Sequence, residues 1–78
     1  EPLRVWETLI RRKKYDNSHE VAADFGSADF LSGNRVVFDI GGNKYRLLVK
    51  MMYQWGKVLI RGVYTHEQYL RASRKGWL

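Results

Sequence analysis

The sequence contains no cysteine, which excludes disulfide bonds and thiolate metal sites as supports for a small fold. Its two histidines, His19 and His66, lie far apart in the sequence. This spacing argues against a histidine metal site, although a site built from carboxylates stays open. We therefore expect the protein to hold no metal and to need no cofactor.

Long apolar runs are missing as well. No stretch approaches the roughly 20 apolar residues that a membrane-spanning helix requires, and no signal peptide is visible. A cytoplasmic protein without a membrane partner is therefore expected. The chain has 78 residues, 45% of them hydrophobic, which predicts one globular domain near the lower size at which a single core suffices.

Acidic residues are scarce in the second half of the chain. Residues 1–33 carry five Lys or Arg against six Asp or Glu, whereas residues 34–78 carry nine against two. The net charge of +6 therefore comes from the second half. A one-sided basic surface attracts polyanions, most commonly nucleic acid, and would also attract an acidic protein or a membrane surface.

Residues 34–64 predict two consecutive β-hairpins. Apolar and polar side chains alternate on both sides of Gly41 and Gly42, which suit a two-residue turn, and a longer loop near residues 52–56 leads into the last strand. The pairs that this turn implies are Ile40–Asn43, Phe38–Tyr45 and Val36–Leu47.

The expected register gathers cations on one face of the sheet, which we expect to be left for function. Lys44 would lie beside Asp39, and Arg46 would lie opposite Arg61. Facing like charges destabilise a sheet, so the pattern indicates a site for an anion. Ordinary solvated strand residues are an equally weighted alternative.

A capping box follows the last strand. Thr65 and Gln68 match the pattern in which two side chains satisfy the first unpaired amides of a helix. His66 then lies in the first helical turn, whose positive end favours a neutral imidazole, and Tyr69 follows on the same side. A lone histidine more often caps or packs than reacts, but its cationic neighbours favour a functional role.

The first part of the chain predicts two helices and a short edge strand. One helix covers residues 1–14. Asp16, Asn17 and Ser18 break it and supply capping side chains for a second, short helix, which can end at Gly26 in a left-handed conformation. Residues 28–31 form the strand. The fold class is α+β, with two N-terminal helices packed on an antiparallel three- to four-stranded sheet and a short C-terminal helix. The predicted core comprises Leu3, Trp6, Ile10, Val21, Phe25, Val36, Phe38, Ile40, Tyr45, Leu47, Val49, Val58 and Ile60.

Two stretches carry a resemblance to a known family. The run NRVVFDIGGNKYRLLVK, followed by a strand and THEQY, resembles the C-terminal part of HigB-type toxins of bacterial type II toxin-antitoxin systems, which belong to the RelE superfamily. The segment EPLRVWETLIRRKK, with the short helix and ADFLSGN after it, is similar to the helical part of that family. The resemblance implies a single RelE-like domain over residues 1–78 in which the family's N-terminal strand is missing.

The resemblance also implies an activity. Members of this family are metal-independent endoribonucleases that cleave mRNA on the ribosome, and a helix-turn-helix antitoxin neutralises them and binds operator DNA as the complex. Attack of the RNA 2′-hydroxyl on the adjacent phosphate needs a proton acceptor, a proton donor and cations. The expected catalytic residues are His66 as acid or base, Arg46 and Arg61 as phosphate clamps, Lys44 as a further cation and Tyr69 as a proton relay or positioning group.

Two other interpretations remain. An RNA-binding module without catalysis would hold phosphates with the same basic strands and stack bases on Tyr53 and Trp55, although these two could equally pack over the sheet edge. In this interpretation, as in the nuclease, the expected RNA-binding residues are Arg35, Lys50, Lys57 and Trp55. A degenerate toxin would only bind its antitoxin. Loss of His66 should harm a nuclease but not a pure binding module.

Overall fold

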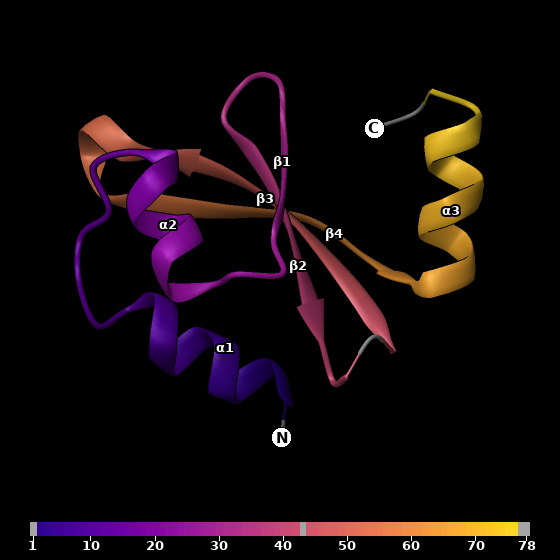
Figure 1. Ribbon diagram of the computed structural model, residues 1–78, viewed down its shortest axis with the longest axis horizontal. Helices are drawn as coiled ribbons and strands as arrows, with labels where there is room; N and C mark the ends of the chain where they lie inside the picture. Colours follow the sequence, from indigo (N-terminus) through magenta and orange to yellow (C-terminus); the bar gives the residue numbers. More distant parts are fainter. Residues whose placement is uncertain (1, 43, 77–78) are drawn as a thin grey trace.

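Four antiparallel strands and three α-helices form the described part of the chain, residues 2–42 and 44–76 of a computed structural model (Figure 1). This architecture confirms the predicted α+β class and the short C-terminal helix. In chain order the elements are α1 (Pro2–Ile10), α2 (Ser18–Asp24), β1 (Asp29–Leu31), β2 (Arg35–Ile40), β3 (Tyr45–Met52), the 3₁₀ turn η1 (Tyr53–Trp55), β4 (Lys57–Thr65) and α3 (His66–Arg74).

The strands follow one another across the sheet in chain order, β1-β2-β3-β4, so each strand pairs with its sequence neighbour. Gly33 and Asn34 turn the chain between β1 and β2 with positive φ angles of 72° and 59°, a conformation that Gly and Asn tolerate best. β1 has three residues and β4 has nine. β1 and the longer strand β4 form the two edges of the sheet.

The register of β2 and β3 differs from the predicted one. Phe38 pairs with Leu47, and Ile40 pairs with Tyr45, so the prediction of a two-residue turn was wrong. The predicted partner of Ile40, Asn43, lies outside the described residues. Four residues separate the two strands, which shifts the pairing by two residues. Because side chains alternate with a period of two, the shift preserves their faces and changes only their partners.

A β-bulge at Arg61 changes the second hairpin. Ile60 and Gly62 pair with consecutive residues of β3, so Arg61 is the extra residue without a partner in the ladder. Arg46 lies opposite Tyr64, and the predicted pairing of Arg46 with Arg61 is wrong. The alternation of β3 is unaffected by an extra residue in β4, which is why the sequence pattern does not reveal the bulge.

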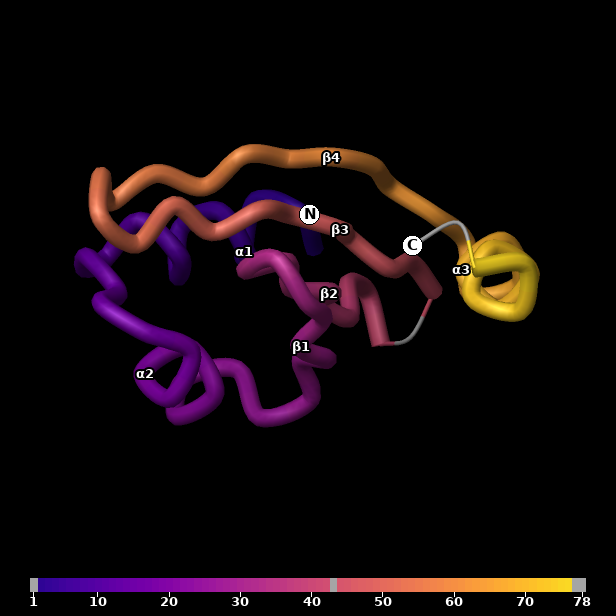
Figure 2. Tube along the Cα trace, turned by 90° about the horizontal axis from the view of Figure 1, so that it is seen from above, coloured from indigo at the N-terminus to yellow at the C-terminus, as the bar shows by residue number. Residues whose placement is uncertain are grey.

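Side chains from α1 and α2 pack against one face of the sheet, which we call the core face. The Trp6 and Phe38 rings lie 5.5 Å apart, and the Phe25 ring meets Phe38 edge-on at 4.9 Å. Figure 2 shows α1 and α2 near one end of the molecule and α3 at the other. The buried core cluster comprises Trp6, Ile10, Tyr15, Val21, Val36, Phe38, Ile40, Leu47, Val49 and Met51.

Three predicted core residues are exposed instead. Leu3, Tyr45 and Ile60 are 37%, 46% and 56% exposed, respectively. Ile60 lies in the edge strand β4, and Tyr45 begins β3 at the end of the sheet where the turn leaves it. Membership of the apolar face was predicted correctly for both residues. Their burial was not, because it depends on which parts of that face the helices reach.

The first helix is shorter than predicted because Tyr15 enters the core. α1 ends at Ile10, and Tyr15, which is 4% exposed, donates a hydrogen bond of 2.8 Å from its hydroxyl to Asp24 Oδ2. Lys13 lies 5.1 Å from the centre of the Tyr15 ring and 3.2 Å from Asp24 Oδ2. This network joins the end of α2 to the segment after α1. None of the described helices is long and apolar enough to cross a membrane.

The caps of the two later helices follow their local sequence. Asn17, one of the three predicted capping residues, caps α2 and accepts a hydrogen bond of 3.1 Å from the amide of Glu20. The predicted left-handed end at Gly26 is wrong, because Phe25 is the C-cap residue and Gly26 has no positive φ angle. Thr65 caps α3 in the predicted capping box.

Candidate active site

The face of the sheet opposite the core face, here called the outer face, carries three successive cross-strand pairs of β2 and β3. They are Arg35–Lys50, Val37–Leu48 and Asp39–Arg46. The middle pair is buried outside the core cluster. α3 contacts both β3 and β4 and buries its own Ala72. This face was expected to be left for function. Val37 and Leu48 at its middle are buried, whereas Lys50 and Leu59 of the same face are exposed.

Arg46 is the centre of one polar end. Its Nη1 lies 3.0 Å from Asp39 Oδ1, and its Nη2 lies 3.1 Å from His66 Nδ1. The guanidinium carbon lies 5.9 Å from the centre of the Tyr69 ring, within cation–π range. We call Asp39, Arg46, His66 and Tyr69 the Arg46 cluster. With its side chain only 11% exposed, Arg46 is held between β2 and α3.

The contact between Arg46 and His66 determines which nitrogen of the neutral imidazole carries the proton. A guanidinium group can only donate hydrogen bonds, so Nδ1 of His66 is the acceptor. The proton of the neutral ring is then on Nε2. Because His66 is exposed and Nδ1 is occupied, Nε2 is the nitrogen that remains for a substrate.

The capping box places His66 and Tyr69 beside Arg46. Thr65 Oγ1 accepts a hydrogen bond of 3.1 Å from the Gln68 amide, and Gln68 Oε1 accepts one of 3.0 Å from the Thr65 amide. Thr65 is also the last residue of β4, so no flexible linker separates the sheet from the first turn of α3. A spacing of three residues puts Tyr69 on the same helical side as His66, as predicted.

Sequence reasoning missed two residues beside Arg46. Asp39 was placed next to Lys44 by the incorrect two-residue turn, and Tyr64 was treated only as the end of a strand. In the structure Tyr64 faces Arg46, and its ring covers Gly62, where an added Cβ atom would lie 2.9 Å from the tyrosine hydroxyl oxygen. A turn of four residues between the two strands would have predicted the Asp39–Arg46 pair, in which the one acidic residue of β2 faces a cation.

Two of the expected catalytic cations lie outside the Arg46 cluster. Lys44 is exposed and belongs to the turn before β3 rather than to the strand, and its amide donates a hydrogen bond of 3.4 Å to the Gly41 carbonyl. Arg61 is exposed in the bulge of β4 and makes no hydrogen bond or ion pair with other described residues. The pairing that suggested a clamp of two arginines is therefore absent.

Two expected RNA-binding residues form the other polar end of the outer face. Arg35 and Lys50 lie directly opposite each other, four residues along the strands from the Asp39–Arg46 pair, which corresponds to about 13 Å. Arg35 Nε donates a hydrogen bond of 2.9 Å to the Ser32 carbonyl, which orients its guanidinium, while Lys50 is exposed. This spacing is too large for both ends to bind a single phosphate.

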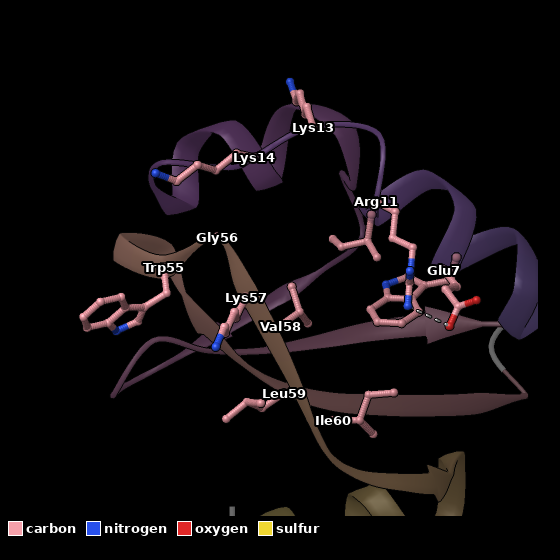
Figure 3. Close-up of a pocket in the computed structure, with 12 residues that line it drawn as sticks. Glu7, Arg11, Lys13, Lys14, Trp55, Gly56, Lys57, Val58, Leu59 and Ile60 are labelled. Carbon is pink, nitrogen blue, oxygen red and sulfur yellow. Dashed lines mark ion pairs between the residues drawn. The ribbon is translucent and has the colours of Figure 1, made fainter.

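The other two expected RNA-binding residues lie far from the Arg46 cluster. Lys57 begins β4 and Thr65 ends it, so eight residues, or about 26 Å of strand, separate Lys57 from the start of α3. Trp55 is in η1 and is 62% exposed. Both residues line a groove between α1 and β4 (Figure 3). Lys57 pairs with Met52, two residues along β3 from Lys50, so Lys57 lies on the same face of the sheet as Lys50.

Across the described residues, no three His, Asp or Glu side chains gather in a way that could hold a metal ion. The Arg46 cluster instead combines a cation, a carboxylate, an imidazole and a phenol. Such groups can bind a phosphate oxygen and exchange a proton with an atom bonded to it. These are the requirements of phosphodiester chemistry.

Comparison with known proteins identifies the family. No curated protein matches the chain. The model of the HigB toxin family, described as the RelE-like toxic component of a toxin-antitoxin system, matches residues 1–71. These residues include both N-terminal helices, the whole sheet, and His66 and Tyr69 of the Arg46 cluster. The chain therefore belongs to the HigB toxin family and is the toxic component of a toxin-antitoxin system.

Proposed function

We propose that this toxin is a metal-independent endoribonuclease that acts in the cytoplasm on mRNA bound to the ribosome. Membership of the HigB family supports the proposal, and the α+β architecture is compatible with the RelE-like fold that the resemblance implies. The observation that carries it is the contact of 3.1 Å between Arg46 and His66, which joins a phosphate-binding group to a proton-transfer group.

The reaction would be attack of the RNA 2′-hydroxyl on the adjacent phosphorus. The 2′-oxygen loses its proton to a base and forms a bond to phosphorus, the bond to the 5′-oxygen breaks, and the 5′-oxygen receives a proton. The products are a 2′,3′-cyclic phosphate and a 5′-hydroxyl end. Negative charge grows on the phosphoryl oxygens in the transition state, so a guanidinium held beside them lowers the barrier.

We assign roles within this reaction by position. Arg46 binds a phosphoryl oxygen, His66 transfers a proton, and Tyr69 positions Arg46 through its ring or relays a proton. Lys44 and Arg61, which lie outside the cluster, would bind flanking phosphates as accessible cations. Arg35 and Lys50 would bind the RNA backbone farther along the outer face.

The hydrogen bond that Arg46 donates to His66 suggests how substrate binding prepares the imidazole. In the absence of RNA, the lone pair of Nδ1 is occupied by the guanidinium. An arriving phosphate competes for that guanidinium, because a charge-assisted bond to an anion is stronger than a bond to a neutral ring. Release of Nδ1 then leaves the imidazole able to accept a proton. His66 would become a base only once a phosphate is bound.

The partner in this proposal is a helix-turn-helix antitoxin that neutralises the toxin and brings it to operator DNA only as part of the complex. Family membership supports an antitoxin partner, and the excess of basic residues in the second half of the chain favours an acidic one.

The decisive experiment is an mRNA cleavage assay on translating ribosomes, with and without the antitoxin encoded by the adjoining gene. The proposal expects cleavage that stops when the antitoxin is added. Binding to ribosomes without cleavage would instead indicate an RNA-binding module. Association with the antitoxin, without ribosome binding or cleavage, would indicate a degenerate toxin.

A further inference from the structure

Tyr64 lies beside the Arg46 cluster and has no role in the reaction proposed above. It is directly opposite Arg46 in the pairing of β3 and β4, so both side chains are on the outer face, with Cβ atoms about 4.5–5.5 Å apart. An aromatic ring on the neighbouring strand is therefore within one cross-strand spacing of the arginine that would bind the phosphate.

The ring of Tyr64 folds back over its own strand. Gly62 lies two residues earlier on the same face, and a Cβ atom added there would lie 2.9 Å from the tyrosine hydroxyl oxygen and 3.1 Å from the ring carbons Cε2 and Cζ. The φ angle of Gly62 is not positive, so the backbone conformation does not require a glycine at this position. The space that the ring occupies does require one.

Two further observations favour a ring that meets a ligand over a ring that supports the fold. The bulge at Arg61 directly precedes Gly62, and bulges next to active sites re-aim nearby side chains. Tyr64 is also only partly buried, and its hydroxyl makes no hydrogen bond with other described residues. A tyrosine buried for structural reasons usually has such a partner.

We propose that the ring of Tyr64 stacks on the base of a nucleotide adjoining the phosphate that Arg46 binds. The inference rests on the proposed ribonuclease function, and it makes Tyr64 a residue that contacts the substrate. Unstacked bases of single-stranded RNA bind to proteins by stacking on aromatic side chains. A base held on Tyr64 while Arg46 holds the adjoining phosphate would fix the ribose between them, which orients the 2′-hydroxyl for attack.

The test removes the ring and the base separately. Tyr64→Leu keeps an apolar side chain but removes the stacking surface, and an abasic ribonucleotide on one or the other side of the cleaved bond removes one base of the message. Single-turnover cleavage is measured on programmed ribosomes for every combination of toxin and message. Tyr45→Leu is the matched control, because Tyr45 adjoins Arg46 in β3 but lies on the core face and is 46% exposed.

With the unchanged toxin, we expect one of the two abasic messages to be cleaved at least about fivefold more slowly than the intact message, the smaller effect usual for the loss of one stacked base. Tyr64→Leu should slow cleavage of the intact message by a similar factor and should no longer distinguish it from the abasic message. Tyr64→Phe, which keeps the ring, and Tyr45→Leu should both behave like the unchanged toxin. If Tyr64→Leu slowed cleavage of intact and abasic messages equally, Tyr64 would only support the fold, and the inference would be overturned.

A second pair of variants tests the position of the ring. Gly62→Ala puts a methyl group where the Tyr64 ring lies, whereas Gly26→Ala adds one where no atom lies within 4 Å and the φ angle is not positive. Gly62→Ala should reduce the difference in rate between intact and abasic messages, and Gly26→Ala should leave it unchanged. An unchanged difference in the Gly62→Ala toxin would overturn the inference, because displacing the ring would then have no effect on the base.

The intact message separates this inference from the proposed function. If the unchanged toxin cleaves the intact message and both abasic messages at the same rate, the stacking inference fails and the proposed function stands. If the unchanged toxin cleaves no message on ribosomes, the proposed function fails first, and the inference fails with it.

Discussion

Arg46 contacts all three other residues of the Arg46 cluster, so its loss should reduce the rate of cleavage. We predict that Arg46→Ala lowers cleavage on ribosomes more than tenfold, which corresponds to about 1.4 kcal/mol of transition-state stabilisation. The substitution removes the cation beside the phosphate and the donor that orients His66.

Arg61→Ala is the matched control, because it removes an exposed arginine of the neighbouring strand that lies outside the cluster. We expect it to lower cleavage less than tenfold. Circular dichroism should show that both variants fold. A larger loss for Arg61→Ala than for Arg46→Ala would show that the bulge, rather than the Arg46 cluster, holds the reacting phosphate.

The second prediction at the residue scale separates proton transfer from positioning. His66→Gln retains a hydrogen-bonding side chain beside Arg46 but cannot exchange a proton, so cleavage should be almost abolished while ribosome binding persists. His19→Gln makes the same change in the exposed first turn of α2 and should leave both properties unchanged. Near-normal cleavage by His66→Gln would move the proton transfer to Tyr69 or a lysine.

Local patterns were sufficient to predict some contacts of these residues but not others. The capping box and the three-residue spacing of His66 and Tyr69 depend on neighbours in one helical turn, and both were predicted correctly. The partner of Arg46 depends on the length of the preceding turn and on the bulge in β4. Those two features are set by the chain as a whole, so Asp39 was missed.

At the scale of elements, the capping box that begins α3 also supports the site. Thr65→Ala removes the side chain that accepts the Gln68 amide hydrogen bond and should lower the free energy of unfolding by about 1 kcal/mol. For a domain of this size, that change corresponds to a melting temperature lower by about 4–8 °C. Cleavage should fall as well, because His66 is in the turn that frays.

Thr8→Ala is the control for that change, since Thr8 is an exposed residue inside α1. Alanine has the higher helix propensity, so stability should stay the same or rise slightly. If Thr65→Ala melts at the same temperature as the unchanged protein, the capping box contributes nothing to the stability of α3.

The connection between α1 and α2 should be sensitive to alkaline pH. Burial and then the hydrogen bond to Asp24 raise the pKa of Tyr15 from its ordinary 10.0 to about 12. The folded protein therefore keeps a proton that the unfolded chain loses, so the stabilisation is complete below pH 10 and is lost as the pH rises from 10 to 12. Urea unfolding of Tyr15→Phe measures this contribution.

At pH 8 we expect Tyr15→Phe to be less stable than the unchanged protein by about 1 kcal/mol, the usual net value of a hydrogen bond. The difference should shrink between pH 10 and 12. Tyr45→Phe, at a position 46% exposed, should show no such difference at either pH. A gap that stays constant up to pH 12 would contradict the assignment.

The hydrogen bond between Tyr15 and Asp24 also makes the stability of the folded protein depend on pH in acid. The hydrogen bond from Tyr15, and after it the one from Lys13, lower the pKa of Asp24 below its ordinary 3.8. The contribution of Asp24 is therefore present above that value and is lost as the pH falls through the lowered pKa.

At the scale of the whole molecule, the sequence predicted which strand faces are apolar and which are cationic, because alternation survives a two-residue shift of register. The sequence did not predict which part of each face the helices cover. Ile60, which was expected in the core, is exposed in the edge strand β4, while Val37 and Leu48 on the outer face are buried. Coverage depends on where helices end and turn, which alternation does not encode.

The arrangement of cations leads to a prediction about salt. If RNA follows the outer face, Lys50 contacts a phosphate, while Lys14, in the segment between α1 and α2, does not. Each phosphate contact with single-stranded nucleic acid adds about 0.7 to the slope of log affinity against log salt concentration. Lys50→Gln should therefore reduce the slope for an oligoribonucleotide by about 0.7, and Lys14→Gln should leave it unchanged.

Fluorescence anisotropy at several salt concentrations measures both slopes with the same oligoribonucleotide. The two substitutions remove the same charge, so a general effect of net charge would reduce both slopes equally. A reduction found only for Lys14→Gln would place RNA in the groove between α1 and β4, which Lys14 lines. The outer face would then lose its role in backbone binding.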